Sequence, residues 1–154
     1  HPAADGASMQ PSTRTASEVL LEPTTIYVKP VLNVLRDFDV KGMVHVTGGG
    51  FYDNIPRILP QSVTARIEYG SWNVPKVFSW LQAAGELTLE QMLQVFNCGI
   101  GFMLVVAPEQ VSEVLNRLKR AFKLASWKIG EVVRRRDAEA ERVEIDFTRQ
   151  FRRS

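Results

Sequence analysis

The segment Val40–Arg57 limits most strongly what this chain can fold into, because it combines a strand, three consecutive glycines and the start of a helix. Residues 41–47 have the alternation of a strand. The glycines follow directly, and residues 51–58 have the composition of a short helix. A turn without side chains can direct several backbone N–H groups at one point. The segment therefore predicts a corner that can hold an anion, most often a phosphate.

Gly48, Gly49 and Gly50 have two interpretations at this level. They could form a phosphate cradle at the start of the helix, or a tight strand-to-helix turn that needs positive φ. Glycine runs serve both purposes, so the motif alone leaves the two open. The spacings GxxxxGK[ST] and GxGxxG are absent, so neither a P-loop nor a dinucleotide fingerprint is predicted.

His45 precedes Thr47 by two residues on the expected strand, so both side chains face the same way. Val44 and Val46 face the other way. From this position His45 could act on the ligand as a proton donor or polarise one of its oxygens, and Thr47 could contact the anion. The alternative is a histidine hydrogen-bonded within a packed sheet, and the lack of a visible partner favours it.

Asn54 and Arg57 are three residues apart and share one face of the short helix. Arg57 could bind a phosphate through two parallel hydrogen bonds. An exposed arginine at a helix C-terminus is equally well explained by the helix dipole. Both residues are therefore candidate phosphate ligands.

Asn97, Gly99 and Gly101 precede an apolar strand and could let a ligand or another backbone approach closely. The alternative, which the pattern slightly favours, is a helix stop at Asn97 and a bulge at the strand entry. Cys98 has no histidine or basic neighbour, so a catalytic thiolate is not expected. The spacing of His, Cys, Asp and Glu predicts no metal site.

The hydrophobic pattern predicts an α+β fold with a mixed sheet of about five strands and helices on its faces. The wholly apolar run 100–107 predicts a central strand covered on both faces. The last two strands, 127–133 and 142–147, are expected to form a hairpin. The remaining helix signals are a first helix within 25–38 with Pro30 in its first turn, an Asn73 cap, a Gly85 stop and a Thr88–Gln91 capping box.

Residues 18–148 are expected to form one domain, between a disordered leader (1–17) and a frayed basic tail (149–154). The chain begins at His1, so we expect a fragment or a processed product, and a transit-peptide remnant is one alternative. The net charge of +2 does not predict nucleic-acid binding, and the apolar run Phe102–Ala107 is too short to cross a bilayer.

Several blocks taken together resemble the phosphoribosylformylglycinamidine cyclo-ligase family, also called aminoimidazole ribonucleotide synthetase. They occur in the family's order and cover roughly residues 20–133. The blocks are Leu21–Thr24, Ile26–Lys29, Val46–Phe51, Asn54–Arg57, Gly70–Trp72, Trp80–Gln82 and Phe96–Gly101.

The resemblance implies a three-layer α/β/α unit with a mixed sheet, the C-terminal domain of a cytoplasmic, homodimeric enzyme. That enzyme closes the imidazole ring of aminoimidazole ribonucleotide from formylglycinamidine ribonucleotide in purine biosynthesis. In that family ATP and Mg²⁺ activate the formyl oxygen by phosphoryl transfer, an amidine nitrogen attacks the activated carbon, and phosphate leaves. Most contacts to ATP and the metal are made by an N-terminal domain. Neither a nucleic acid nor a membrane is an expected partner.

The sequence departs from the family in ways that predict no turnover from this chain alone. The N-terminal domain and an upstream His-Ser-Asn-Gly run are not present, and Thr25 stands where the family commonly has arginine. If the N-terminal domain normally covers one face, an exposed apolar patch is expected. The alternatives are a non-catalytic phosphate-binding or protein-docking module, and the C-terminal domains of selenophosphate synthetase or thiamine-monophosphate kinase.

Overall fold

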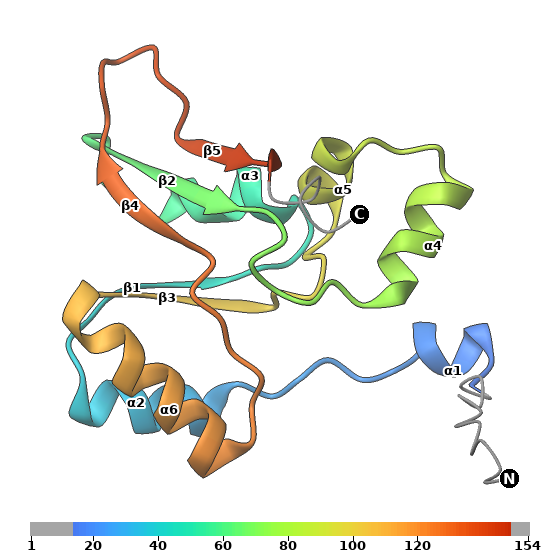
Figure 1. The fold of residues 1–154 in the computed structure, drawn as a ribbon, viewed down its shortest axis with the longest axis horizontal. Helices are drawn as coiled ribbons and strands as arrows, with labels where there is room; N and C mark the ends of the chain where they lie inside the picture. Colours follow the sequence, from blue (N-terminus) through green and yellow to red (C-terminus); the bar gives the residue numbers. More distant parts are fainter. Residues whose placement is uncertain (1–13, 149–154) are drawn as a thin grey trace, which may run out of the picture.

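The computed structural model describes residues 14–148, so residues 1–13 of the predicted leader and the whole predicted tail lie outside the described residues (Figure 1). The helices are α1 (Ala16–Leu20), α2 (Val28–Asp37), α3 (Gly50–Asn54), α4 (Lys76–Ala84), α5 (Leu89–Val95) and α6 (Val111–Phe122), with 3-10 turns η1 (Ile55–Arg57) and η2 (Pro108–Gln110). The strands are β1 (Val40–His45), β2 (Val63–Glu68), β3 (Phe102–Val106), β4 (Gly130–Arg134) and β5 (Val143–Asp146).

The α+β class and the five strands are confirmed, and the strands divide into two sheets. Strands β1 and β3 form an antiparallel ribbon. The other sheet has the order β4-β2-β5, in which β4 is antiparallel to β2 and β5 is parallel to it. The pairing is therefore mixed, as expected, within the three-stranded sheet.

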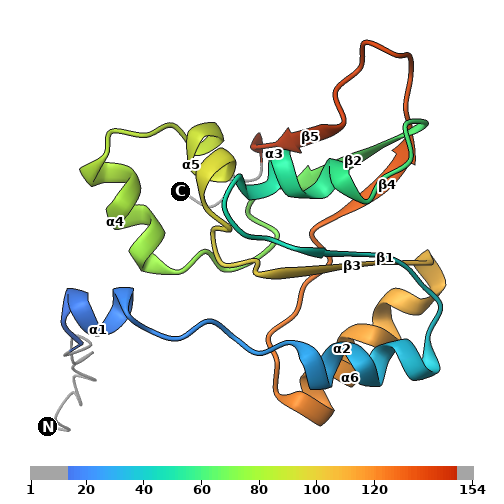
Figure 2. The ribbon, with the colours of Figure 1, turned by 180° about the vertical axis from the view of Figure 1, so that it is seen from behind.

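The predicted hairpin of the last two strands is wrong, because β2 lies between β4 and β5 (Figure 2). Both ends of the connecting loop are held at the start of β2. Arg135 N–H donates to the Ser62 carbonyl at 2.8 Å, and the Thr64 hydroxyl donates to the Glu141 carbonyl at 2.7 Å. With both ends fixed there, the loop passes around the end of β2, and β5 pairs with the edge of β2 opposite to β4.

The prediction that residues 100–107 form a central strand is also wrong. Within residues 14–148, β3 pairs with β1 alone, and none of its residues is fully buried. Leu104 and Val106 pack against the α2–α6 pair, while Met103 packs on the main core from the other face. Both faces thus have partial cover, but the second edge of the strand has no strand beside it.

The helix boundaries follow local chemistry, with one correction. The Thr88–Gln91 capping box at α5 is confirmed, and Gly85 ends α4 as expected. The predicted Asn73 cap is wrong, since α4 begins at Lys76. Pro75 disfavours helical backbone at the residue before it, and Pro75 itself has ψ 139°, outside the helical region, so the helix starts after it. Thr15 and Glu18 also form a capping box, which makes the end of the range expected as leader helical.

Two apolar clusters hold these elements together. The larger lies between β1, α3, α5 and the three-stranded sheet, and it includes Phe51, Trp72 and Leu93. The smaller joins α2 to α6 through Val34 and Val114, among others. Figures 1 and 2 show α2 and α6 along one side of the β1–β3 ribbon, with the three-stranded sheet on the other. In residues 14–148, no helix combines the length and hydropathy that a bilayer crossing requires.

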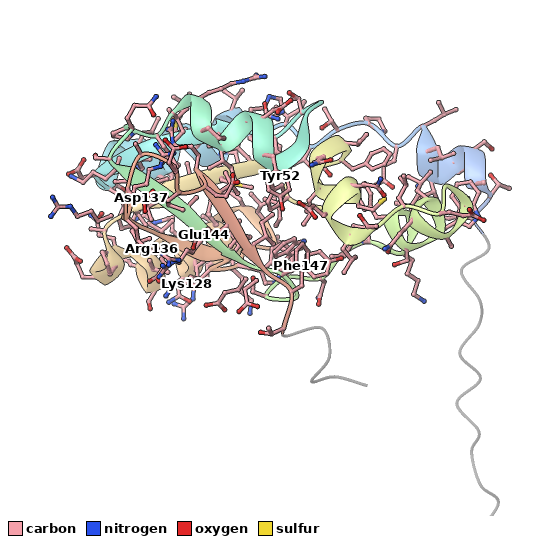
Figure 3. The ribbon with its side chains drawn as sticks, turned by 90° about the horizontal axis from the view of Figure 1, so that it is seen from above. Tyr52, Lys128, Arg136, Asp137, Glu144 and Phe147 are labelled. Atoms are coloured by element: carbon pink, nitrogen blue, oxygen red, sulfur yellow. The ribbon has the colours of Figure 1, made fainter. Side chains whose placement is uncertain are left out.

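The outer side of the three-stranded sheet carries charges of both signs. Arg66 of β2 pairs with Glu144 of β5 at 3.0 Å, and Arg136 approaches the same carboxylate at 3.6 Å. Figure 3 shows Arg136 and Glu144 together on this side of the sheet, with Phe147 toward its other end. Arg136 of the basic run after β4 therefore lies beside an acidic side chain, and the expectation about nucleic acid stays a prediction.

Candidate functional site

The three glycines form a type II β-turn that leads into α3. The Gly50 N–H donates to the Thr47 carbonyl at 3.1 Å, and Gly49 has φ 91° and ψ −3°. These values place Gly48 and Gly49 at the two central positions of the turn. The second of these positions requires positive φ, which explains why Gly49 is a glycine. We refer to Thr47–Gly50 together with Asn54 as the glycine corner.

Gly50 and Gly48 are glycines for different reasons. A Cβ added to Gly50 would overlap the carbonyl oxygen of Leu93 in α5, so close packing of the two helices demands a bare α-carbon. A Cβ added to Gly48 would meet nothing within 4 Å. The turn and its packing therefore account for Gly49 and Gly50, but they do not account for the open surface at Gly48.

Asn54 braces the corner from inside. Its side chain is 4% exposed, and Nδ2 donates to the carbonyls of Thr47 at 3.3 Å, Gly48 at 3.2 Å and Gly50 at 2.7 Å. In a trans peptide the N–H points opposite to the C=O. The N–H groups of Gly48 and Gly49 therefore point away from Asn54, toward solvent. In the described part of the chain, neither N–H has a hydrogen-bond partner.

Two charged side chains flank these donors. Arg57 is exposed, and its Nη1 donates to Asn54 Oδ1 at 3.3 Å, so the predicted shared face is confirmed. Asp53 lies on the other side: a Cβ at Gly49 would sit 2.5 Å from its Oδ2. Sequence reasoning missed Asp53, although an acid in the first turn of a helix is a known preference. Its carboxylate opposes an anion bound at the corner.

His45 is exposed on the same side of β1 as Thr47, while Val44 and Val46 are buried, as the alternation predicts. Its ring lies 6.3 Å from that of Tyr27 and 6.0 Å from that of Phe102. The histidine is thus not packed within the sheet. The outward N–H groups of the glycine corner also point away from the core, so both the histidine and these donors are accessible to solvent.

The structure explains Asn97, Gly99 and Gly101 by contacts within this chain. Asn97 Oδ1 accepts the N–H of Gly99 at 3.0 Å. Gly99 has φ 95°, and a Cβ there would lie 2.5 Å from Pro75 Cδ. At Gly101 a Cβ would collide with the hydroxyl of Tyr27. The atoms that approach these glycines belong to this chain, so in this structure they serve packing.

Cys98 offers no nucleophile. The side chain is buried, and burial raises the pKa of its thiol to about 11. Its carbonyl accepts a hydrogen bond from Trp72 Nε1 at 3.0 Å. The thiol is therefore protonated near neutral pH, and the expectation that it is not catalytic stays a prediction. In residues 14–148 no group of three or more His, Cys, Asp or Glu side chains is arranged to hold a metal ion.

A cavity lies away from the glycine corner. It has a volume of about 400 Å³ and runs between residues 99–106 on one side and residues 124–132 on the other. Its lining is mainly apolar, and it includes neither Thr47 nor any glycine of the turn. The corner is instead an open surface site, which suits a group recognised through backbone donors rather than through enclosure.

Comparison with known proteins gives a family match and several close relatives. Residues 3–142 match the family described as AIR synthase related protein, C-terminal domain. The chain is 59% identical to a phosphoribosylformylglycinamidine cyclo-ligase of Nitratidesulfovibrio vulgaris over 136 residues, which are 88% of this chain and 39% of the relative. It is 48% identical to the Bacillus subtilis protein of the same name over 128 residues, 80% of this chain and 37% of the relative. The chain thus spans about two fifths of the length of these relatives.

Proposed function

This chain belongs to the family of AIR synthase related proteins, as a C-terminal domain, and on that basis we propose that it works as the C-terminal domain of a phosphoribosylformylglycinamidine cyclo-ligase. The identity to relatives of that name is the observation that carries the proposal. It also favours this reading over the C-terminal domains of selenophosphate synthetase and thiamine-monophosphate kinase.

The proposed reaction is an ATP-dependent ring closure of formylglycinamidine ribonucleotide. The γ-phosphoryl group of ATP passes to the formyl oxygen, because an amide oxygen is otherwise a poor leaving group. The amidine nitrogen then attacks the formyl carbon, the C–O bond breaks, phosphate leaves and the nitrogen gives up a proton. Negative charge on the phosphoryl group must be met by fixed donors or cations during the transfer.

We assign the glycine corner the task of binding a phosphate of the nucleotide. Two observations support this: the outward N–H groups of Gly48 and Gly49 lack partners in the described chain, and Gly48 is open to solvent. Asn54 holds the carbonyls of the turn inward, so the donors are already oriented before the ligand arrives. Preorganised donors cost no ordering on binding.

The flanking side chains receive separate roles in this proposal. Arg57 adds positive charge beside the donors, positioned by its bond to Asn54. His45 and Thr47 face the same side, where His45 can polarise or protonate a ligand oxygen. Asp53 reduces affinity for a free anion, and it can instead accept a hydrogen bond from the ribose or the amidine.

ATP and Mg²⁺ belong to the N-terminal part of the enzyme in this proposal. Among the described residues, no group of three or more His, Cys, Asp or Glu side chains is arranged to hold a metal ion. The complete enzyme is proposed to be a cytoplasmic homodimer, and the chain by itself is proposed to lack turnover.

The test joins the N-terminal region of the Nitratidesulfovibrio vulgaris relative to this chain at the matched boundary. The joined polypeptide should form aminoimidazole ribonucleotide in an ATP-dependent manner, and the 154-residue chain alone should not. Ring closure by the isolated chain, or none by a folded joined polypeptide that binds substrate, would refute the proposal. The second result would favour the non-catalytic phosphate-binding module.

The phosphate assignment has its own pair of variants. Gly48→Pro removes one outward N–H, and proline suits the first central position of a type II turn. Gly48→Ala keeps the N–H and adds a methyl group to open space. We expect Gly48→Pro to raise the Kd for the substrate nucleotide roughly tenfold, as loss of a charge-assisted hydrogen bond requires. Equal Kd values for the two variants would remove the corner from the binding site.

A further inference from the structure

The free edge of β3 faces a cleft that has the shape and lining of a strand site. The whole run Gly99–Val106 borders the cleft, including residues from both faces of β3. The run Leu124–Val132 borders the opposite side in the same continuous way. Side chains of a strand alternate between faces, so a space that touches every residue lies along the edge of the strand. We call this space, between Gly99–Val106 and Leu124–Val132, the β3 cleft.

The backbone of β3 has donors directed into this cleft. The N–H of Val46 donates to the Gly101 carbonyl at 2.9 Å, which makes these two a hydrogen-bonded pair. In an antiparallel ladder such pairs alternate, so Met103 and Val105 also bond to β1. Phe102 and Leu104 then direct their N–H and C=O groups to the other edge. No strand in residues 14–148 pairs with that edge.

The floor and roof of the β3 cleft are both apolar. Val111, Leu115 and Leu118 of α6 line one side, and Ile55, Ala65 and Ile67 of the main core line the other. An extended segment placed in the cleft would therefore meet apolar surface on both faces. The only charged side chains along the lining are Lys128 and Glu131.

We propose that the β3 cleft receives a β-strand from the part of the cyclo-ligase polypeptide that precedes the matched region. The strand would pair with β3 on one edge and with the 124–132 segment on the other, and would unite the two sheets. Since both of its faces are covered, it is a continuous apolar run of about eight residues rather than an alternating one. This inference rests on the proposed function, because it takes the partner from the same polypeptide.

Three observations select this occupant. The curated relatives are about two and a half times as long as the matched region, so they contain chain that could supply the strand. The match is to a C-terminal domain, which places that chain upstream. The segment between α1 and α2 of this chain lines the cleft at Thr25 and Tyr27, but it forms no strand and pairs with neither edge.

Amide hydrogen exchange resolved by residue tests the proposal. In the joined polypeptide described above, we expect exchange at Phe102 and Leu104 to slow about tenfold or more relative to the isolated chain, through new hydrogen bonds. Met103 and Val105 already bond to β1 and serve as internal controls, so they should slow less. Equal slowing at all four residues, or none, would overturn the proposal.

A charge placed in the cleft provides the matched variant. Ala125 is exposed and lines the cleft, whereas Ala121 is exposed on α6 and does not line it. Ala125→Arg should return exchange at Phe102 and Leu104 in the joined polypeptide to the rates of the isolated chain, since the docked strand would bury an unpaired charge. Ala121→Arg should keep the slow exchange. Slow exchange in both variants would contradict strand docking.

The outcomes separate this inference from the proposed function. A joined polypeptide that closes the ring while Phe102 and Leu104 exchange freely disproves the strand and leaves the function intact. Slow exchange at both residues without ring closure supports the strand and rejects the function. Protection that appears in the isolated chain and grows with its concentration would identify a second copy as the occupant, and would overturn our assignment.

Discussion

The glycine corner and the β3 cleft lie on the same two-stranded ribbon and differ in how completely this chain satisfies them. At the corner, one buried amide bonds three carbonyls, and Gly50 meets α5 without a gap. Along β3, a wholly apolar strand leaves one edge unpaired beside a cavity of about 400 Å³. The corner is an open surface site whose turn is braced by hydrogen bonds. The cleft borders a strand edge with which no strand in residues 14–148 pairs.

This difference shows that two kinds of group are exposed in the same molecule: polar backbone donors at the corner, and apolar groups with an unpaired strand edge at β3. At Gly48 the exposed donors are polar, and water satisfies them until a ligand arrives. At β3 the exposed groups are apolar or belong to an unpaired strand edge, which proteins normally cover. The expected apolar patch stays a prediction, since α2 also exposes apolar side chains such as Val28 and Leu32.

The largest expected contrast in the free energy of unfolding comes from truncating one leucine behind the glycine corner and one beside the β3 cleft. Leu93 is fully buried behind the corner, so Leu93→Ala should lower the free energy of unfolding by about 3–5 kcal/mol. Leu115 borders the β3 cleft and is half-buried, so Leu115→Ala should cost about 1–2 kcal/mol in the isolated chain. Urea denaturation measures both. Similar losses would mean that the cleft is closed in solution.

Gly50→Ala tests how tightly the corner is packed. The added methyl group overlaps the Leu93 carbonyl and sits at φ 55°, so we expect a loss of roughly 2–5 kcal/mol from overpacking and left-handed backbone. Gly48→Ala, at an open position, should change stability by less than about 0.5 kcal/mol. Thermal unfolding followed by circular dichroism compares the two. A mild effect at Gly50 would show that α5 can move away from the corner.

Asn54→Asp tests the brace. The replacement keeps the shape but turns an oxygen toward three carbonyl oxygens, which should cost about 2–4 kcal/mol at neutral pH. Protonation of the introduced carboxyl group would restore one donor, so the folded state raises its pKa. The variant should therefore recover stability as pH falls, relative to the unchanged chain. No such recovery, measured by urea denaturation at several pH values, would contradict the inward orientation of the amide.

The smallest effect concerns the α2–α6 pair, which forms one side of the β3 cleft. Hydrogen bonds from Arg36 and from Arg117 lower the pKa of Asp37 from 3.8 to about 2. The stability that Asp37 contributes is present above pH 4 and is lost as the pH falls toward 2. Asp37→Asn should flatten the stability profile in that window, because the carboxylate that binds Arg117 is gone. Identical acid profiles for both proteins would show that this ion pair contributes nothing measurable.

Local chemistry made much of the corner predictable from sequence. The alternation around Val44, the capping box at Thr88 and the shared face of Asn54 and Arg57 all depend on neighbours within a few residues. The binding role of these residues stays a prediction. Asp53 was missed because only the folded turn brings its carboxylate next to Gly49.

The errors arose where the outcome depends on distant chain. The sequence near β4 and β5 does not indicate which edge of β2 each will join. The hydrogen bonds that hold the two ends of the connecting loop come from Ser62 and Thr64, which are distant in sequence. The apolar run of β3 predicts a central strand covered on both faces, but in residues 14–148 that cover is partial and one edge has no strand beside it.

The contact between Gly50 and the Leu93 carbonyl also links the binding surface to a more distant helix. With no slack between these backbones, a displacement of α5 must be transmitted to the turn, and tightening of the turn by a phosphate must be felt at α5. The short helix α3 beside the ligand and α5 behind it should accordingly move as one unit. Because α4 contacts α5, that movement should extend to α4.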